Sequence, residues 1–555
     1  MVRTTNTSQL VTWWHAEAEV NTSKNNPVQV DNVRQSGLYS VQVALGGSDK
    51  AFYDSFVYHV VPANGMDDQR CNSLDLDQDQ SWSSFLYSED VVVKVTRSNK
   101  TSGSVVIRPT NLGFDLDDDG ESVFITVPYS DKGYRFSVEF EDNLMVVTPS
   151  NAREPRNALL IFASPTEDAS VVPADGQSVT HPAPGRVRGL DTTEASTVHF
   201  GPGVYYFGGE DHMKLSPSVT WVYFAPGAYV KGAVEFTSKG PEVKATGHGV
   251  LSGEQYVWYA DPAHGYRHPG DANNNGLRMW SGNNGDNPQT FVLNGVTICA
   301  PPFNSMDWKG WKDSVAKVTC RVRDYKQVGS FYFETDGIQV YPGSSLEDVF
   351  YHANDDTIKM YHSNVSICNL VVWKLNVAPI VQFGWEPRNT ENVTIDGVDV
   401  IHQAYNNEGS NPGLFGSNNN YRDVKNGLPY VWENDEKVWK KHTADVKQLT
   451  RNITLSNFRS EGPSACLFRI CPLQNIDNVT IRNVWIESWE PDTLDTTNSR
   501  LLDFYDRDTG EQVNITNFTI KGLVVGDVPV TAENADTVGK IKEVHSSYKS
   551  QLKIL

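Results

Sequence analysis

The sequence predicts an all-β protein in which an N-terminal β-sandwich, residues 1–180, precedes a right-handed parallel β-helix, residues 181–555. Three observations predict this architecture. Helical periodicity is almost absent, and short apolar runs bounded by Gly, Asn, Asp and Pro dominate the chain. The N-terminal part alternates apolar and polar residues between polar turns. The remainder repeats one short phrase at intervals typical of solenoid coils.

The N-terminal part contains short alternating segments of the kind that form the strands of a sandwich. These segments are Tyr39–Val43, Phe56–Val60, Asp90–Val95, Ser104–Arg108, Phe124–Val127 and Phe136–Phe140. A stretch rich in Pro, Gly and Ser, from Pro173 to Gly189, follows them and is the best candidate for a linker. The acidic segment Asp115–Gly120 resembles half of a calcium loop, but Thr126 stands where such a loop needs a bidentate Glu. We therefore expect a hairpin turn there, and no metal site.

Beyond the linker, an Asn or Gly followed by apolar and β-branched residues recurs along the chain. Its copies are Gly295–Ile298, Asn364–Ile367, Asn392–Ile395, Asn452–Leu455, Asn478–Ile481 and Asn517–Ile520. A solenoid coil buries its apolar face only by stacking on its neighbours. The pattern lacks the leucines of a leucine-rich repeat and the longer units of a propeller, so it favours a parallel β-helix. Coils stacked at about 4.8 Å present a long flat face on which a linear polymer can lie.

The net charge limits the classes of molecule that the protein is expected to bind. The chain of 555 residues has a net charge of −21, which argues against nucleic acid and anionic membranes because both are polyanions. A carbohydrate partner is then expected to be neutral. The sequence contains no run of about 18 apolar residues, so it predicts no membrane-spanning helix. We expect a monomer without a cofactor.

Nine N-x-S/T sequons and an even number of cysteines favour a secreted glycoprotein that carries N-glycans. The first six residues lack the apolar core of a signal peptide, which leads us to expect a mature chain whose signal has been removed. A cytosolic protein with accidental sequons is the alternative. The sequons lie at Asn6, Asn21, Asn99, Asn364, Asn392, Asn452, Asn478, Asn514 and Asn517.

The six cysteines contain no C-x-x-C pair, which disfavours a zinc site. Disulfide bonds are expected instead, with their connectivity open and free buried cysteines as the alternative. Cys466 and Cys471 are close enough in sequence to close a short loop, and Cys299 and Cys320 lie about one repeat apart. The remaining two are Cys71 and Cys368.

The chemistry is concentrated between Phe331 and Trp385, where Asp336 precedes the pair Asp355 and Asp356 by about one coil length. Stacking of coils then brings the three carboxylates together. Because close carboxylates repel one another, one is expected to stay protonated while its neighbours are charged. Glycoside hydrolysis needs this division between an acid and a base. A turn or an Asn/Asp ladder is the alternative interpretation.

These motifs also resemble those of a known family. Thr-Asp-Gly followed by Asn-Asp-Asp on a β-helix is similar to the polygalacturonase superfamily, and the whole chain resembles glycoside hydrolase family 49, the dextranases and isopullulanase. The matching phrases are Val28–Tyr39, Trp221–Gly232, Ala245–Glu254, Ala300–Asp307, Asp324–Gly329, Thr335–Pro342 and Asn354–Tyr361.

The resemblance implies an inverting endo-glycosidase with Asp355 as the general acid and with Asp336 and Asp356 as the carboxylates that activate water. Within the family the sequence resembles isopullulanase more than it resembles the dextranases, which implies cleavage of the α-1,4 bonds of pullulan to give isopanose. Cleavage of the α-1,6 bonds of dextran is the alternative. One position departs from the family pattern, since Gln339 stands where a Glu is usual. The loss of this charge leads us to expect impaired activity.

Several further side chains are candidates for binding the sugar. Aromatic rings stack on sugar faces, and the candidates are Tyr332, Trp308, Tyr361 and Trp385, of which Trp385 matches a subsite tryptophan in the resemblance. Lys359 and Gln339 are the polar candidates, whereas His248 is expected in a turn. Two other functions compete with hydrolysis. A polysaccharide lyase would need Ca²⁺ and an anionic substrate, and a non-catalytic carbohydrate-binding β-helix would not need three clustered aspartates.

Overall fold

The computed structural model describes most of the chain. The described residues are 2–6, 9–21, 28–47, 51–62, 78–99, 103–147, 152–174, 178–207, 212–260, 276–284, 287–308, 317–375, 377–404, 411–417, 430–433, 436–439, 442–491 and 498–555, with backbone alone at 5–6, 430–433, 436–439 and 442. They fall into two compact units, which are considered one at a time. The first comprises Met1–Met145, Glu154–Tyr332 and Asp348–Phe350, and the second comprises Val146–Arg153, Phe333–Glu347 and Tyr351–Leu555.

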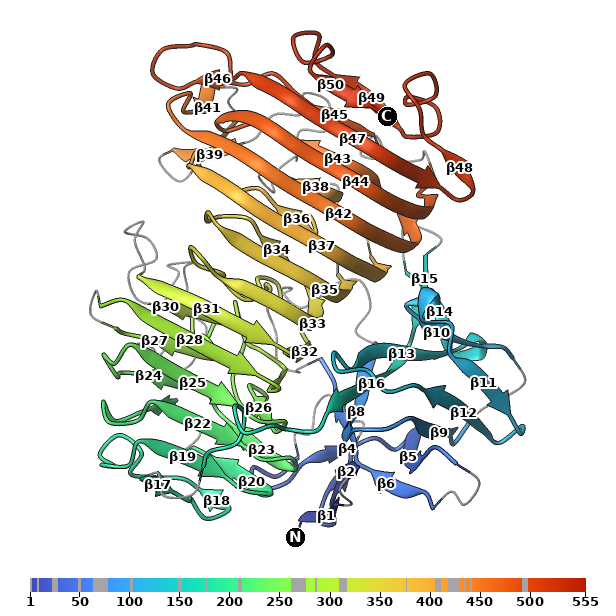
Figure 1. Ribbon diagram of the computed structural model, residues 1–555, viewed down its shortest axis with the longest axis vertical. Helices are drawn as coiled ribbons and strands as arrows, with labels where there is room; N and C mark the ends of the chain where they lie inside the picture. The colour runs from blue at the N-terminus through green and yellow to red at the C-terminus, as the bar shows by residue number, and fades with distance from the viewer. Residues whose placement is uncertain are drawn as a thin grey trace. The chain divides into compact units, whose positions relative to one another are not determined.

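The first unit begins with two β-sheets packed face to face. In the described part, the larger sheet has nine strands in the order β10-β13-β16-β8-β7-β4-β3, with β2 paired to β8 and β1 to β2, and the smaller has the order β11-β12-β9-β5-β6 (Figure 1). The strands are β1 (Val2–Asn6), β2 (Leu10–His15), β3 (Glu19–Val20), β4 (Arg34–Gln35), β5 (Tyr39–Leu45), β6 (Tyr53–Ser55), β7 (Val57–Val60), β8 (Asp79–Tyr87), β9 (Val91–Arg97), β10 (Val105–Arg108), β11 (Asp115–Asp118), β12 (Ser122–Val127), β13 (Tyr134–Phe140) and β16 (Asn157–Pro165). Two 3₁₀ turns, η1 (Thr110–Leu112) and η2 (Glu141–Asn143), complete this region. Two short paired strands, β14 (Leu144–Val147) and β15 (Ala152–Pro155), each have residues in both units.

Alternating residues of both sheets fill one common core. Val41 and Val93 from the smaller sheet pack in the same buried cluster as Phe136 and Leu159 from the larger. The β-sandwich prediction is therefore confirmed. The acidic segment forms the predicted hairpin, because β11 pairs antiparallel with β12 from Asp115 opposite Thr126 onward.

The first unit continues into a parallel β-solenoid. The strands β19, β22, β25, β28 and β31 stack as one parallel ladder, β20, β23, β26, β29 and β32 as a second, and β21, β24, β27 and β30 as a third (Figure 1). The strands are β17 (Val179–Thr180), β18 (Gly185–Arg186), β19 (Thr197–Phe200), β20 (Gly203–Tyr206), β21 (Met213–Lys214), β22 (Trp221–Phe224), β23 (Ala228–Lys231), β24 (Val234–Phe236), β25 (Glu242–Thr246), β26 (Val250–Ser252), β27 (Trp280–Gly282), β28 (Gln289–Asn294), β29 (Thr297–Cys299), β30 (Met306–Trp308), β31 (Val318–Arg323) and β32 (Lys326–Val328).

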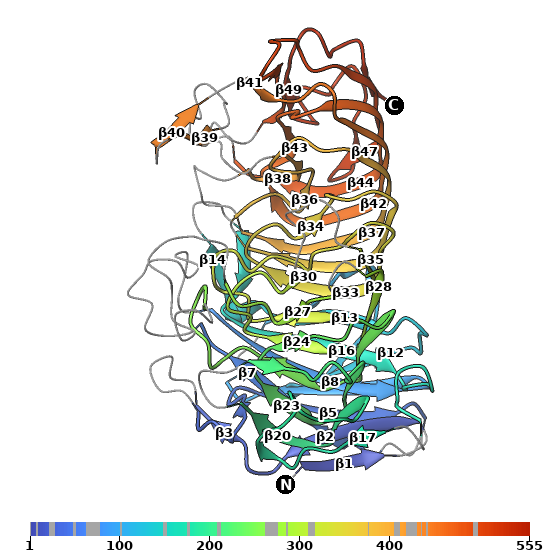
Figure 2. The same ribbon diagram turned by 90° about the vertical axis from the view of Figure 1, so that its left-hand side faces the viewer.

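The second unit is a solenoid with longer strands. One parallel ladder joins β35, β37, β42, β44, β47 and β50, and another joins β34, β36, β38, β43, β45 and β49 (Figure 2). The strands are β34 (Ile358–Lys359), β35 (Val365–Lys374), β36 (Val381–Gln382), β37 (Thr390–Gln403), β38 (Gly413–Gly416), β39 (Tyr430–Glu433), β40 (Glu436–Trp439), β41 (His442–Ala444), β42 (Leu449–Ser464), β43 (Cys466–Ile470), β44 (Asn475–Trp489), β45 (Ser499–Leu501), β46 (Tyr505–Asp506), β47 (Ile515–Val525), β48 (Val528–Pro529), β49 (Ile541–Val544) and β50 (Leu552–Ile554).

The repeated phrases of the sequence stack on one another in this ladder. Val365 pairs with Val393, which pairs with Ile453, and the column continues through Val479 to Phe518. All five side chains are buried. The phrase therefore marks the coil, as the repeat predicted.

An asparagine begins each of these stacked segments. Asn364, Asn392, Asn452, Asn478 and Asn517 all have a left-handed backbone, with φ between 53° and 59°. Asparagine tolerates this conformation better than most residues. From Asn364 to Asn478 the side chains form a ladder in which Nδ2 of each later member donates to Oδ1 of the previous asparagine, at 3.0 Å, 3.2 Å and 2.9 Å, whereas Asn517 Nδ2 donates to Asp477 Oδ1 at 3.0 Å. We call this row the asparagine ladder.

The expectation of disulfide bonds is corrected for the described cysteines. Cys299, Cys320, Cys368, Cys466 and Cys471 are all free. Cys299 pairs in register with Val328, and Cys320 with Phe291, so the two lie in different columns of the solenoid. Cys71 lies outside the described residues. Within those residues, no helix is long and apolar enough to cross a membrane.

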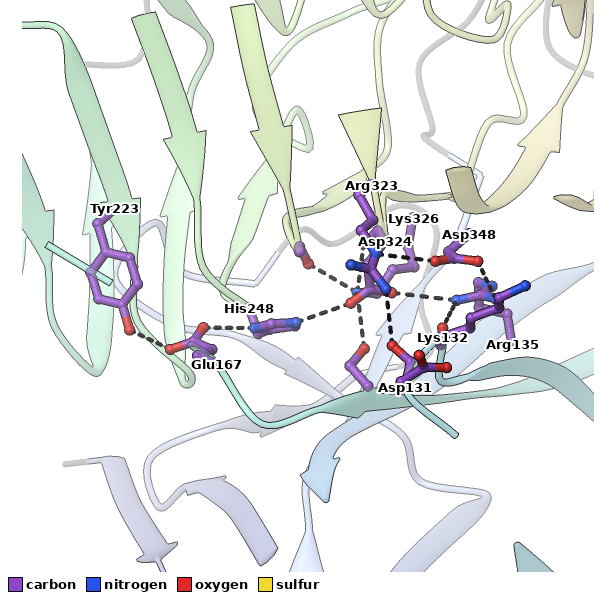
Figure 3. Close-up of polar contacts among 12 residues, drawn as sticks. Asp131, Lys132, Arg135, Glu167, Tyr223, His248, Arg323, Asp324, Lys326 and Asp348 are labelled. Atoms are coloured by element: carbon purple, nitrogen blue, oxygen red, sulfur yellow. Dashed lines mark hydrogen bonds and ion pairs between the residues drawn. The ribbon is translucent and has the colours of Figure 1, made fainter. Parts of the chain in front are cut away.

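A buried polar network fastens the sandwich to the coils inside the first unit (Figure 3). Glu167, just after the sandwich, bonds to His248 Nδ1 at 2.6 Å, and Asp324 bonds to His248 Nε2 at 3.0 Å. Asp324 also pairs with Lys326 at 3.1 Å and with Arg135 of β13 at 3.6 Å. His248 lies in a bend between β25 and β26 rather than in the predicted turn, and its buried imidazole bridges two carboxylates.

Candidate active site

Two backbone segments of the second unit place the three aspartates together. The Asn354 N–H donates to Thr335 O at 3.1 Å, and the Gly337 N–H donates to Asp356 O at 3.0 Å. The stacking predicted for Asp336 and the pair Asp355 and Asp356 is therefore present. A Cβ on Gly337 would lie 2.0 Å from Thr357 O, so only glycine permits this close approach.

The aspartate pair lies in a bend rather than in a strand. Asp355 and Asp356 follow β33 (Ser345–Ala353) and precede β34. Strand alternation therefore does not send the two side chains to opposite faces. The Asp356 N–H donates to Oδ1 of Asp355 at 2.8 Å, and both residues are buried.

Each of the other two carboxylates has its own partners. Asp336 Oδ2 forms an ion pair with Lys359 Nζ at 2.8 Å. Asp356 accepts three hydrogen bonds: at Oδ1 from Gln382 Nε2 at 3.0 Å, and at Oδ2 from Tyr361 Oη at 2.5 Å and Trp385 Nε1 at 2.6 Å. Several donors on one carboxylate fix its orientation.

Asp355 differs in its electrostatic environment. Burial raises the pKa of Asp355 well above its usual range, and the neighbouring charges of Asp336 and Asp356 raise it further, whereas Lys374 acts in the opposite direction. Burial lowers the pKa of Lys374 to about 8, against the attraction of the same carboxylates. The arrangement supplies one carboxyl that holds its proton beside two carboxylates with cationic or hydrogen-bonding partners.

Of the residues predicted to bind the sugar, only some lie beside the three aspartates. Lys359, Tyr361 and Trp385 contact the aspartates directly, and Trp385 is partly exposed. Gln339 is buried, and its Nε2 donates to Val340 O at 3.4 Å.

Two predicted aromatic residues belong to the first unit. Trp308 is fully buried against Phe291, and its N–H donates to Gln289 at 3.1 Å, which leaves it no surface for a sugar. Tyr332 packs in a buried cluster that includes Phe303.

Sequence reasoning missed two buried residues of the site. Gln382 lies on β36, paired in register with Lys359 of β34, and Lys374 ends β35. Neither residue carries a sequence signal of its own, because Gln382 is placed only by its register with Lys359 and Lys374 follows an ordinary Val-Val-Trp run. In the described ranges, no group of three or more His, Cys, Asp or Glu side chains is arranged to hold a metal ion.

Comparison with known proteins identifies the family of the chain. Residues 1–166 match the glycosyl hydrolase family 49 N-terminal Ig-like domain, and residues 440–555 match glycosyl hydrolase family 49. Between them, residues 302–337 match a beta solenoid repeat from dextranase, and residues 373–405 match an isopullulanase beta-solenoid repeat.

Whole-chain relatives point to the same family. Isopullulanase of Aspergillus niger is 58% identical over 549 residues, which are 98% of this chain and 95% of the relative. Dextranase of Talaromyces minioluteus is 36% identical over 98% of this chain and 92% of its own. The solved structure of Dex49A from Penicillium minioluteum is 34% identical and superposes with a TM-score of 0.88 over 100% of both chains. The chain belongs to glycosyl hydrolase family 49.

Proposed function

We propose that the protein is an inverting endo-hydrolase of a neutral α-glucan, and that it cuts the α-1,4 bonds of pullulan to release isopanose. The observation that carries this proposal is the buried cluster of three aspartates, in which Asp336 and Asp356 have their own partners and burial raises the pKa of Asp355. The 58% identity to an isopullulanase supports the choice of pullulan. Cleavage of α-1,6 bonds in dextran is the second candidate, favoured by the dextranases among the relatives.

In the proposed reaction, Asp355 gives its proton to the glycosidic oxygen as the bond from that oxygen to the anomeric carbon breaks. A water molecule attacks the anomeric carbon from the opposite face and loses its proton to Asp336 or Asp356. The products are two shorter glucans, one with an inverted anomeric hydroxyl. Trp385, which is partly exposed, offers a ring for a sugar face next to these carboxylates.

We also propose that Gln339 lowers the turnover rate. It stands at a buried position, three residues after Asp336 in the chain, where the resemblance to the family implies a carboxylate. A Gln339→Glu variant is expected to hydrolyse pullulan faster. Equal kcat values for the wild type and the variant would show that Gln339 does not limit turnover.

Secretion, N-glycosylation and a monomeric state complete the proposal. The sequon Asn364 is exposed in the described structure. Mass spectrometry of protein secreted by a fungal host, before and after removal of N-glycans, tests the glycans, and light scattering tests the monomer.

One incubation separates the candidate activities. The protein is mixed with pullulan and with dextran, and the products are identified by chromatography and by proton NMR of the first-formed anomer. Isopanose with an inverted anomer supports the proposal, isomaltose supports a dextranase, and unsaturated sugars indicate a lyase. If neither the wild type nor Gln339→Glu forms any product, the proposal that the protein is a hydrolase is overturned.

A further inference from the structure

Gln382 is a fully buried amide with no part in the reaction described so far. It lies on β36 with 0% of its side chain exposed. Its Nε2 donates to Asp356 Oδ1 at 3.0 Å, and its Oε1 accepts the Gly384 N–H at 3.1 Å. A buried amide that meets a carboxylate on one side and a backbone donor on the other has only one satisfactory orientation.

The backbone around Gln382 fixes that orientation. Met360 N–H donates to Gln382 O at 2.9 Å, and β36 pairs with strands on both sides, Lys359 and Gly416 being the register partners of Gln382. Because Gly384 offers a hydrogen, the amide oxygen must face it, and the NH₂ group must then face Asp356. Side chains held in this way keep catalytic groups in their productive geometry.

The donors divide unequally between the two oxygens of Asp356. Tyr361 and Trp385 both donate to Oδ2, whereas Gln382 donates to Oδ1. A carboxylate offers about four lone-pair sites, two on each oxygen. The donors named here fill both sites of Oδ2 and one site of Oδ1, which leaves Oδ1 as the oxygen able to accept a water molecule.

We propose that Gln382 is a positioning residue that holds Oδ1 of Asp356 toward the attacking water. This inference rests on the proposed function, in which Asp356 helps to activate water. As the water oxygen bonds to the anomeric carbon, its proton passes to Oδ1, and the leaving oxygen takes the proton of Asp355. Gln382 itself contacts neither water nor sugar in this scheme.

The charged and titratable groups around Asp356 come from several elements. They are Asp336 and Glu334 on the preceding segment, Asp355 in the same bend, Lys359 on β34, Lys374 on β35, and Tyr361 and Arg388 in the following loops. Gln382 is an uncharged donor among them. Its loss therefore makes the charged form of Asp356 less favourable without changing the net charge of the site.

The test uses the full-length protein with pullulan and two substitutions at this position. Gln382→Met removes both hydrogen-bonding functions at similar volume, and Gln382→Glu keeps an acceptor for Gly384 but replaces the donor. Loss of a hydrogen bond to a charged group is expected to lower kcat roughly 10- to 100-fold. KM stays within about twofold, and the acidic limb of the kcat/KM profile moves to higher pH, further for Gln382→Glu.

Gln327 provides a matched control, since it is also a fully buried, hydrogen-bonded glutamine and lies in the first unit. Gln327→Met is expected to lose stability without a change in kcat or in the pH profile. An unchanged kcat and acidic limb in both Gln382 variants would overturn the proposal.

A crystal structure of Gln382→Met gives a readout that does not depend on activity. The Asp356 carboxylate is expected to rotate away from its present orientation, and an unmoved carboxylate also overturns the proposal. If Asp356→Asn retains full kcat, the proposed role of Asp356 fails instead, and the crystal structure still reports whether Gln382 orients that side chain.

Discussion

The backbone N–H of Asp356 donates a 2.8 Å hydrogen bond to Oδ1 of Asp355, so one aspartate of the pair fixes the carboxyl of the other. The bond leaves Asp355 Oδ2 to carry the proton that the raised pKa retains. Two adjacent aspartates therefore play opposite parts: one holds a proton and the other collects hydrogen-bond donors.

Asp355→Asn should abolish acid catalysis while it leaves the bend intact. An Asn side chain keeps an oxygen that accepts the Asp356 N–H, but it has no acidic proton to give. We expect kcat on pullulan to fall by about 10²- to 10⁴-fold. A glycosyl fluoride, whose leaving group needs no protonation, should lose much less activity, and equal losses on both substrates would contradict the acid role.

Lys374→Met should move the basic limb of the pH profile. The lysine cation favours the charged form of Asp355, so its removal raises the pKa of Asp355 further. The acid then stays protonated to higher pH, and kcat/KM should fall off later on the basic side. Lys374→Arg keeps the charge and serves as the control, and a basic limb that does not move in Lys374→Met would show that the cation has no influence on the acid.

Trp385→Phe separates the two contributions of this tryptophan. The ring remains for a sugar face, but the N–H that donates to Asp356 at 2.6 Å is lost. Because hydrogen bonds to charged groups are worth about 1.5–3 kcal/mol, we expect kcat to drop roughly tenfold or more with little change in KM. Trp385→Ala should also raise KM, and an equal KM in both variants would mean that the ring does not bind sugar.

His248→Gln tests the polar network of the first unit. Burial lowers the pKa of His248, but the hydrogen bonds that its ring nitrogens donate to Asp324 and Glu167 outweigh this effect and raise the pKa above 6.5. A raised histidine pKa gives stability that is complete below pH 6.5 and is lost as pH rises through the folded-state pKa. The variant should therefore lose about 3 kcal/mol at pH 6 and less at pH 9. Melting curves across this pH range measure the difference, and a constant gap would contradict a charged His248.

Glycan occupancy should differ among the sequons. Asn392, Asn452 and Asn478 each use Nδ2 as a donor in the asparagine ladder, whereas the ladder uses only the oxygen of Asn364. A glycan on Nδ2 replaces one of its hydrogens and crowds the adjacent coil. We expect occupancy at Asn364 and little at the other three, measured by ¹⁸O labelling during enzymatic release of glycans from protein made in a secretory host. Full occupancy at Asn452 with an unchanged melting temperature would refute this division.

The coil pattern was predictable because each copy of the phrase combines an asparagine suited to positive φ with inward apolar side chains. The aspartate cluster was predictable because Asp336 and Asp355 lie about one coil apart. Gln382 and Trp308 could not be assigned in this way. The role of Gln382 depends on register across coils separated by loops, and an aromatic residue such as Trp308 fills a solenoid core as readily as a binding face.

The asparagine ladder also changes how the sequon count should be weighed. A coil that begins with a left-handed Asn, then points an apolar side chain inward and a Thr or Ser outward, spells N-x-S/T for reasons of backbone geometry alone. Asn364, Asn392, Asn452, Asn478 and Asn517 arise in this way. A solenoid of this kind thus mimics the signature of a heavily glycosylated protein, and only the sequons outside the repeat are independent indications of the secretory pathway.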